Sequence, residues 1–313
     1  MLRVGTWNLE NLFRSGVAGG PSSQQVYEAK LAALAETIGR LAPDVLAVQE
    51  VGTPAALDDL VARVGGEWHV RTADPDGRGI RVGVMSRLPF LGVEQIVAFP
   101  RGWRPVHLDD SDTLHSAMGR AALHVRVRVG GRVVDVISCH WKSKLLTFPG
   151  GRFSTDDEQE RARFAGYALL RRSCEAVTVR AAVSQLLAGV DPAVVVAGDL
   201  NDEADAATTQ MLHGPPGSEI GTGGYDQADG GDGQRLWNLA ARIPEAQRFS
   251  RVYRGRRELI DHILVSHDLV TLVDDGAVTT DGSGPSPSIT DDPKARRDKP
   301  GSDHRPVVAT VTL

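Results

Sequence analysis

Short apolar runs rich in β-branched residues recur from one end of the chain to the other, and this recurrence constrains the fold more than any other feature. Runs of this length and composition predict β-strands. The run AVVVAG is apolar on both faces, as in a covered central strand, whereas ALHVRVRV alternates as a half-buried antiparallel strand does. The predicted strands lie at 2–7, 44–49, 81–86, 121–129, 132–139, 193–198, 260–265 and 306–312.

Helical periodicity is restricted to the segments 25–41, 55–64 and 157–188. Because the strands outnumber the helices and do not alternate with them regularly, we predict an α/β sandwich in which two mixed β-sheets pack face to face with helices outside. Segments rich in glycine, proline and polar residues are predicted to be loops, the last two of them mobile. These loops lie at 101–119, 213–234 and 281–301.

The composition is that of a globular protein, since 41% of the 313 residues are hydrophobic and can form a sizeable core. The net charge of −5 argues against a protein that coats nucleic acid, although a nuclease needs only a local basic patch. Cys139 and Cys174 are too few for a disulfide framework and predict buried thiols in a reducing compartment. With no signal-peptide pattern and no apolar run near the roughly 20 residues of a membrane span, we expect a cytoplasmic protein. Nothing in the sequence indicates a protein partner.

Polar residues lie at or beside the ends of six predicted strands, where packed sheets form ligand-binding crevices. Taken singly, each has an ordinary explanation as a turn residue, a cap, an exposed charge or a core histidine. Their succession along the chain favours a single site, and because that site needs both chain ends we predict one domain over residues 1–313. These residues are Asn8, Glu50, His140, Asp199, Asp261, Asp303 and His304.

The segments that carry these residues resemble the endonuclease/exonuclease/phosphatase family, which includes DNase I-like nucleases, abasic-site endonucleases, neutral sphingomyelinases and inositol polyphosphate 5-phosphatases. The resemblance implies a four-layer α/β sandwich and Mg²⁺-dependent cleavage of a phosphoester bond, with Mn²⁺ as a substitute. In chain order, the segments are TWNLENLF, VLAVQEV, SCHWKS, VVVAGDLND, LIDHILVS and SDHRPVVATV.

The resemblance also implies metal ligands. Glu50 matches the principal metal carboxylate, and Asn8 lies beside it at the metal and the phosphate. Asp303 matches a metal ligand or an acceptor for a metal-bound water. Mg²⁺ prefers oxygen ligands and retains several waters, so a few such groups together with substrate phosphate suffice.

The remaining matches imply catalytic roles. Asp199 matches the group that orients or deprotonates the attacking water, and Asn201, further along an expected extended segment, would hold a phosphate oxygen. His304 matches a donor to the phosphoryl oxygens, and Asp261 would pair with its other ring nitrogen and favour the cation. His140 resembles a second phosphate-contacting histidine.

Other basic residues allow two interpretations each. Lys142 and Lys144 can reach phosphate or remain solvated, and Arg120 can bind phosphate or form a structural ion pair. The basic run at 251–257 is a phosphate-backbone patch or a solvated hairpin. The histidines without ligand spacing are predicted to lie at the surface, namely His69, His107, His115, His124, His213 and His267.

The function predicted from these features is a metal-dependent phosphodiester hydrolase, with a nuclease acting on DNA or RNA preferred because the HWKS segment resembles stretches in bacterial DNases of the family. The acidic balance and the lack of an apparent aromatic stacking platform favour a second candidate, a phosphatase or phosphodiesterase for a small-molecule or lipid-headgroup phosphate. A binding protein without catalysis on the same fold is a third.

Overall fold

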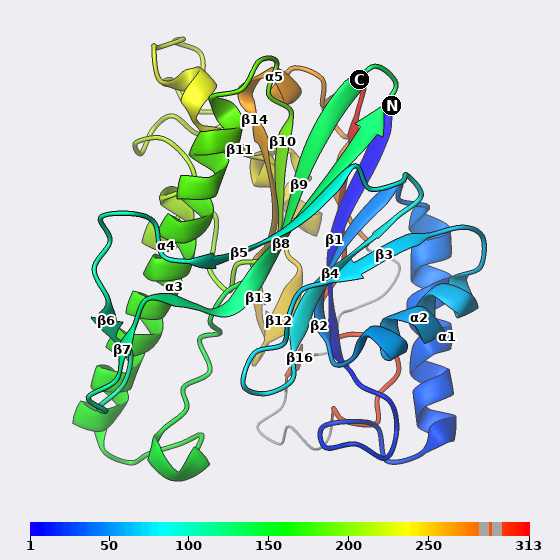
Figure 1. The fold of residues 1–313 in the computed structure, drawn as a ribbon, viewed down its shortest axis with the longest axis vertical. Coiled ribbons are helices and arrows are strands. Elements are labelled where there is room, and N and C mark those ends of the chain that lie inside the picture. Colours follow the sequence, from blue (N-terminus) through cyan, green and yellow to red (C-terminus); the bar gives the residue numbers. More distant parts are fainter. Residues whose placement is uncertain (282–287, 290–295) are drawn as a thin grey trace.

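The computed structural model describes residues 1–281, 288–289 and 296–313, and two six-stranded mixed sheets dominate it (Figure 1). The first sheet has the order β15 (Val278–Thr280), β17 (Val307–Val311), β1 (Leu2–Leu12), β2 (Val45–Val51), β4 (Arg81–Ser86) and β3 (His69–Thr72). Its neighbours β1 and β2 run parallel, while β17 and β4 pair antiparallel with them on either side.

The second sheet is also mixed. Its order is β11 (Leu236–Asn238), β14 (Asp261–Ser266), β10 (Val194–Asp199), β9 (Arg132–His140), β8 (Ala117–Val129) and β5 (Gly92–Ala98). The apolar strand β10 pairs parallel with β9 and antiparallel with β14, which confirms its prediction as a central strand. The alternating run at 122–129 lies in β8, antiparallel to β9 as predicted.

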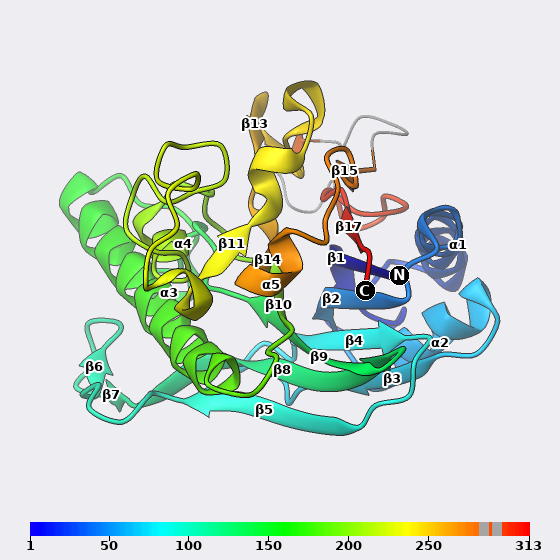
Figure 2. The same ribbon diagram turned by 90° about the horizontal axis from the view of Figure 1, so that it is seen from above.

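The two sheets and the helices form four layers (Figure 2). Apolar side chains such as Val4, Val136 and Val195 form the core between the sheets. Helices α1 (Gln24–Leu41) and α2 (Pro54–Val64) cover the outer face of the first sheet. Helix α3 (Glu158–Leu187) covers the second sheet and is capped by Asp157, whose side chain accepts from the N–H groups of residues 159 and 160. The predicted sandwich is confirmed.

Every predicted strand and helix is present, together with several short elements that no sequence pattern predicts. The predicted loop at 101–119 is wrong in part, because it contains a hairpin of β6 (Val106–His107) and β7 (Leu114–His115), and β8 begins at its end. The missed strand β5 is an edge strand with mostly exposed side chains, so it lacks an apolar pattern. The basic run at 251–257 forms β12 (Arg251–Tyr253) and β13 (Arg256–Glu258), a hairpin that β16 (Ser288–Ile289) joins. The remaining short helices are α4 (Ala207–Gln210) and α5 (His267–Val270).

The structure describes the first of the two long predicted loops in full and the second in part. Residues 213–234 form turns that end in a short 3₁₀ helix at Asp232–Gln234, and their mobility stays a prediction. Of the segment 281–301, residues 282–287 and 290–295 lie outside the described residues. Within the part of the chain that the structure describes, no helix combines the length and apolar character needed to cross a bilayer.

Cysteine and histidine predictions have mixed outcomes. Cys139 and Cys174 are free and buried, as expected. The prediction of surface histidines is wrong for His124, which is buried with its Nε2 2.7 Å from Oδ1 of Asp135 on the neighbouring strand. It is also wrong for His213, which is half-buried and whose pKa burial lowers to about 4. A histidine in an alternating strand or a loop shows no sequence sign of what covers it.

Candidate active site

The predicted site residues extend the inner faces of the strands beyond the apolar core. In β1, Val4 lies in the core between the sheets, and Asn8 continues that face by the two-residue period of a strand. In β10 the same period leads from Ala197 in the core to Asp199. Both Asn8 and Asp199 are buried, so the core between the sheets ends in a layer of polar groups supplied by both sheets.

Strand register places three site residues side by side across the second sheet. Asp199 in β10 is the cross-strand partner of His140 in β9 on one side and of Asp261 in β14 on the other. Directly opposite residues project to the same face, so the three side chains point the same way. Gly198 permits the close approach of β9 to β10, because a Cβ there would lie 2.1 Å from the carbonyl oxygen of Cys139.

Glu50 reaches the site through a β-bulge. Ala47 in β2 lies in the core between the sheets, so a regular pleat would direct Glu50 to the opposite face. The pairing of β2 with β4 shifts between Val48 and Val51, and Glu50 adopts a left-handed φ of 58°. Its Oε1 consequently lies 3.3 Å from Nδ2 of Asn8. Bulges and left-handed non-glycine residues concentrate at functional sites, where they redirect a side chain.

The segment before β17 carries His304 and is tied to β1. The indole N–H of Trp7 donates to the carbonyl oxygen of His304 at 2.9 Å, between residues 297 positions apart in the chain. The hydroxyl of Ser302 donates to the carbonyl oxygen of Asn8 at 2.6 Å. The N-terminal strand therefore positions the C-terminal histidine directly.

Glu10 is a further residue of this region, and it is not among the predicted site residues. Its Oε1 accepts from Nε of Arg296 at 2.8 Å, and its Oε2 accepts from the N–H of Asp303 at 2.9 Å. Burial raises the pKa of Glu10, and the Arg296 hydrogen bond acts in the opposite direction. The only sequence signal is its position two residues after Asn8, where a carboxylate is most often solvated.

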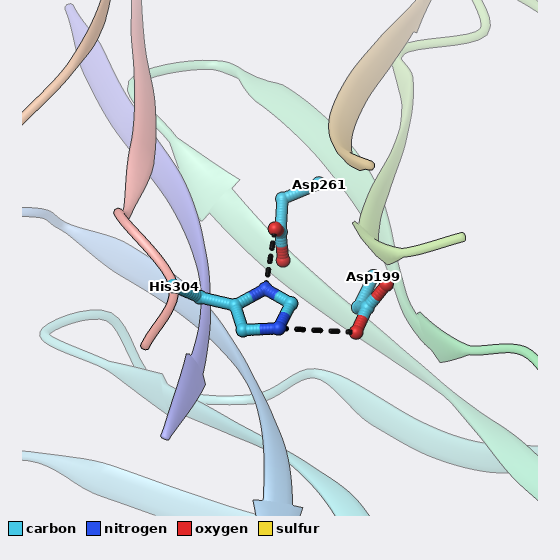
Figure 3. Close-up of side chains that lie close together, drawn as sticks. All are labelled: Asp199, Asp261 and His304. Atoms are coloured by element: carbon cyan, nitrogen blue, oxygen red, sulfur yellow. Dashed lines mark hydrogen bonds and ion pairs between the residues drawn. The ribbon is translucent and has the colours of Figure 1, made fainter. Parts of the chain in front are cut away.

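His304 and Asp261 form a buried ion pair (Figure 3). Nδ1 of His304 lies 2.7 Å from Oδ2 of Asp261, and Nε2 lies 4.0 Å from a carboxylate oxygen of Asp199 and of Asp303. Burial alone lowers the pKa of His304, but the carboxylates of Asp261 and Asp303 outweigh burial and raise it to about 10. The imidazolium is therefore the form at neutral pH, with its Nε2–H available as a donor.

Asp199 lies at the centre of the site. Its Oδ2 accepts from Nδ2 of Asn8 at 2.9 Å and lies 3.6 Å from Nε2 of His140 and 4.0 Å from Nε2 of His304. Burial and the neighbouring carboxylate of Asp261 raise the pKa of Asp199 to about 7, although His304 and Asn8 act in the opposite direction. A carboxyl group with a pKa near neutrality can accept a proton at working pH.

His140 is buried in the neutral form. Burial lowers its pKa well below the usual value, and the Arg120 cation acts in the same direction. Arg120 donates to the carbonyl oxygen of His140 at 2.9 Å and pairs with Asp76 at 2.6 Å. The structure thus places Arg120 in a structural ion pair that holds the His140 backbone, while its contact with phosphate stays a prediction.

The expectation that Asn201 lies on an extended segment is wrong. Strand β10 ends at Asp199, and Asn201 adopts a left-handed φ of 53°. Its N–H donates to Oδ1 of Asp199 at 2.9 Å in a turn that asparagine and aspartate favour. Its Nδ2 donates to the carbonyl oxygen of Trp141 at 3.1 Å, so Asn201 joins β10 to the HWKS segment. A phosphate contact through its Oδ1 stays a prediction.

Glu50 is the carboxylate best placed to hold a divalent cation. It is half-buried, and while Oε2 accepts from the N–H of Asn11 at 2.8 Å, Oε1 has the long contact with Asn8 and lies 4.0 Å from Nε2 of His140. A single available carboxylate with room for water suits Mg²⁺. Asn8 turns its nitrogen to Asp199 and its Oδ1 to the N–H of Glu10 at 2.9 Å. The Asn8 amide thus donates to both carboxylates, and its role as a metal ligand stays a prediction.

A second group with metal-ligand geometry consists of Asp199, Asp261 and His304, whose ligand atoms lie within 4.8 Å of one another. A cation bound to Nε2 of His304 would have to displace the proton that this nitrogen carries in the imidazolium. Since the pKa of His304 is raised to about 10, that proton is firmly held at neutral pH. We therefore favour Glu50 as the principal ligand, with Asp303 beside His304 as a candidate second carboxylate.

The HWKS segment continues from His140 along the rim of the site. The Nζ of Lys142 donates to the carbonyl oxygens of Ser143 at 3.0 Å and Leu145 at 2.6 Å. The N–H of Lys142 donates to the buried carboxylate of Glu175 in α3 at 2.7 Å. Lys142 remains at the edge of a pocket that opens beside the site.

This chain belongs to the endonuclease/exonuclease/phosphatase family, because residues 5–304 match the model of the Endonuclease/Exonuclease/phosphatase family. The resemblance seen in the sequence is therefore confirmed. Members of this family are generally phosphoesterases that use a divalent metal. No curated protein matches the chain in sequence.

Solved structures share the fold at low sequence identity. Truncated TDP2 from Caenorhabditis elegans is 16% identical, with 100% of this chain and 97% of that chain covered and a TM-score of 0.58. The human Nocturnin catalytic domain with bound sulfate anion is 14% identical, with coverage of 98% and 93% and a TM-score of 0.57. A family protein from Leptotrichia buccalis C-1013-b is 12% identical, with coverage of 100% of both chains and a TM-score of 0.55. At these identities the likeness shows the fold alone.

Proposed function

We propose that this protein is a divalent-metal-dependent phosphodiester hydrolase that cleaves nucleic acid with an activated water. The observation that carries the proposal is the position of Asp199, whose Oδ2 lies within 4.0 Å of Asn8, His140 and His304. A carboxylate with a pKa near neutrality, surrounded by donors and buried, is suited to act as a general base.

Each chain group has a distinct task in this proposal. Asp199 accepts a proton from the attacking water, and His304 donates from Nε2 to a phosphoryl oxygen as negative charge develops. Asp261 stabilises the His304 cation and orients its ring through the 2.7 Å contact at Nδ1. Neutral His140 donates to a second phosphoryl oxygen, and Asn8 orients Asp199. A divalent cation held at Glu50 supplies, when bound, charge neutralisation at the phosphate.

A diester is favoured over a monoester because the carboxylates of the site disfavour a doubly charged phosphate. Asp199, Asp303 and Glu50 all lie close to His140 or His304, and the cations of His304 and Arg251 balance them in part. The second candidate, hydrolysis of a small-molecule phosphate, is favoured by the pocket of about 750 Å³ beside the site, a size typical of small-ligand sites.

The test is a panel of plasmid DNA, RNA, bis(p-nitrophenyl) phosphate, p-nitrophenyl phosphate and inositol phosphates, each assayed with Mg²⁺, with Mn²⁺ and with EDTA. We expect EDTA-sensitive turnover of the nucleic acids and of the diester that Asp199→Asn abolishes. The control is Asp58→Asn, which changes an exposed carboxylate of α2. Turnover limited to monoesters would mean that the protein is a phosphatase. No turnover of any substrate would favour the third candidate, a binding protein without catalysis.

A further inference from the structure

The pocket beside the catalytic centre is lined by residues that hydrolysis at a single phosphate does not require. Glu50 and His140 line it at the catalytic end, and it continues between the segment 76–78, the hairpin region 108–111 and helix α3. Its volume of about 750 Å³ can hold a group larger than one phosphate. The pocket therefore extends the site by a substantial subsite.

Two cations of this pocket form no ion pair within the part of the chain that the structure describes. Arg78 and Arg171 both line it, and neither guanidinium has a hydrogen bond or an ion pair with another side chain of the described residues. Lys142 also lines the pocket, and its Nζ donates to backbone carbonyls and to the neighbouring Ser143 hydroxyl. Burial and the charges of Arg171 and Arg78 lower the pKa of Lys142 to about 8. Three positive groups thus line one pocket, close enough to influence one another.

Two carboxylates of the pocket are paired with other arginines. Asp76 is paired with Arg120 at 2.6 Å, and Asp110 is paired with Arg163 at 3.0 Å. Asp109 accepts from the N–H of Ser111 at 2.8 Å; hydrogen bonding with Ser111 lowers its pKa, and the nearby charge of Arg171 acts in the same direction. The buried Glu175 accepts from the N–H of Lys142; burial raises its pKa, while the charges of Arg171 and Lys142 act in the opposite direction. Among the described residues neither Asp109 nor Glu175 forms a direct ion pair with a cation of the pocket, so these cations can still bind an anionic ligand.

The guanidinium of Arg171 occupies space that a glycine leaves open. A Cβ at Gly119 would lie 2.3 Å from Nη2 of Arg171 and 2.9 Å from its Cζ. Any larger residue at position 119 would push this guanidinium out of its place over the strand. Arg171 is therefore seated in a defined position on the pocket wall.

The far wall of the pocket is apolar and aromatic. Phe164 lies 5.2 Å from Phe148 and 5.7 Å from Tyr167 between ring centroids, and Leu108 and Leu146 also line the wall. A phosphate alone would gain nothing from such a wall. A flat apolar group attached to the anion would be removed from water against it.

We propose that this pocket binds the nucleotide next to the scissile phosphate, with a second phosphate at Arg78, Lys142 and Arg171 and a nucleobase against the aromatic wall. The inference rests on the proposed function, since it takes the scissile phosphate to lie at Asp199. It specifies the substrate as a strand that can place a single unpaired nucleotide in the pocket. A free dinucleotide and the end of a longer strand offer the same chemistry.

The test compares ligands with and without the second phosphate. The thymidine dinucleotide TpT carries only the bridging diester, whereas pTpT and TpTp add a terminal phosphate on either side. Binding is measured by calorimetry to the Asp199→Asn protein with Mg²⁺, so that the readout does not depend on turnover. We expect one of the two longer ligands to bind about 10- to 100-fold more tightly than TpT, as a charge-assisted contact supplies. A fluorescein-labelled single-stranded oligonucleotide in the same assay distinguishes a strand end from a free dinucleotide.

Arg171→Met in the same background should remove this preference, and Gly119→Ala should weaken it by displacing the guanidinium. Arg161→Met is the matched control, because Arg161 is exposed on the same helix and pairs with Glu158. Equal affinity for TpT, pTpT and TpTp, or a preference that survives Arg171→Met, would overturn the subsite. An abasic ligand that binds as tightly as pTpT would overturn the role of the aromatic wall.

Turnover of bis(p-nitrophenyl) phosphate separates the two proposals. A protein that prefers the extra phosphate but hydrolyses no diester retains the subsite and loses the proposed function. A protein that hydrolyses the diester and shows no preference retains the function and loses the subsite.

Discussion

The catalytic centre and the pocket beside it differ in how their charged groups are satisfied. In the centre, the Asp261 carboxylate is paired with His304 at 2.7 Å and Asp199 accepts from Asn8 at 2.9 Å. In the pocket, Arg78 and Arg171 form no direct hydrogen bond or ion pair with another side chain of the described residues. The centre is built to keep its geometry without a ligand, whereas the cations of the pocket remain available for one.

The difference follows from the elements that carry each region. The centre lies on strand ends whose register is determined by the core between the sheets, so its side chains have little freedom. The pocket is enclosed by a helix face and by connecting segments, which tolerate change in sequence and length. Changes in the centre should therefore affect every substrate alike, while changes in the pocket should affect only substrates that reach it.

The largest effect is expected for Asp199→Asn. Loss of the general base should lower kcat by about 10²- to 10⁴-fold on all diesters, with or without a second phosphate. Steady-state kinetics on bis(p-nitrophenyl) phosphate and on a dinucleotide measure this, with Asp58→Asn as the control. A loss confined to one of the two substrates would break the distinction between centre and pocket.

Asp261→Asn should lower kcat by about 10²-fold at pH 8 and alter the pH profile. The Asp261 carboxylate helps to raise the pKa of His304 to about 10, so its removal should lower that pKa. Because the cation is the active form, the basic limb of the profile should move to lower pH. The profile of kcat/KM and the NMR titration of His304 report this shift, and an unchanged basic limb would mean that Asp261 does not control His304.

Glu50→Gln should act through the metal. Removal of the anionic ligand should raise the Mg²⁺ concentration for half-maximal activity by about 10-fold or more. Asp199→Asn should lower turnover while leaving this concentration nearly unchanged, so the two variants differ in kind. Metal titrations of residual activity provide the measurement, and identical half-saturation for wild type and Glu50→Gln would contradict the ligand assignment.

Arg78→Met should have a smaller and selective effect. Arg78 is exposed, so water screens its contact with an anion, and we expect about 3-fold weaker binding of the ligand with the second phosphate. Arg161→Met again serves as the control. If the affinity for TpT fell equally, Arg78 would attract anions in general and would not bind the second phosphate in the pocket.

The pH dependence of the free energy of unfolding should show how the buried ionisable groups of the centre affect stability. The pKa of Asp199 rises from 3.8 to about 7 on folding and that of His304 from 6.5 to about 10, so the folded protein binds more protons than the unfolded chain. The contributions of these groups to the free energy of unfolding should thus fall as pH rises between about 4 and 10. Asp199→Asn should stabilise the protein at pH 8, because it removes a buried charge.

Chemical denaturation of wild type, Asp199→Asn and Asp58→Asn over this pH range tests the prediction. Destabilisation by Asp199→Asn at pH 8 would contradict the raised pKa of Asp199. We also propose that the chain unfolds as a single domain, since the site needs both Asn8 and His304, and two separate transitions would exclude this.

The two-residue period of the strands determines which residues of the catalytic centre can be located from the sequence. Asn8, Asp199 and Asp261 continue the inner face of predicted strands, so a two-residue alternation places them together. Glu50 has the opposite alternation, and only the bulge in β2 turns it into the site. Asn201 likewise lies in a left-handed turn that no apolar pattern reveals. Family resemblance, and not periodicity, is what identifies these two residues in the sequence.

The sequence by itself determined the two sheets, the three long helices and the polar ends of the strands, because burial of alternating apolar side chains is a local pattern. Only the tertiary structure decided the rest: the link from Glu10 to Arg296, the burial of His124, and the gathering of Arg78, Lys142 and Arg171 around one pocket. These contacts join segments far apart in the chain, and their strength depends on burial and on neighbouring charge. Neither burial nor neighbouring charge at a position can be deduced from the residues that precede and follow it in the sequence.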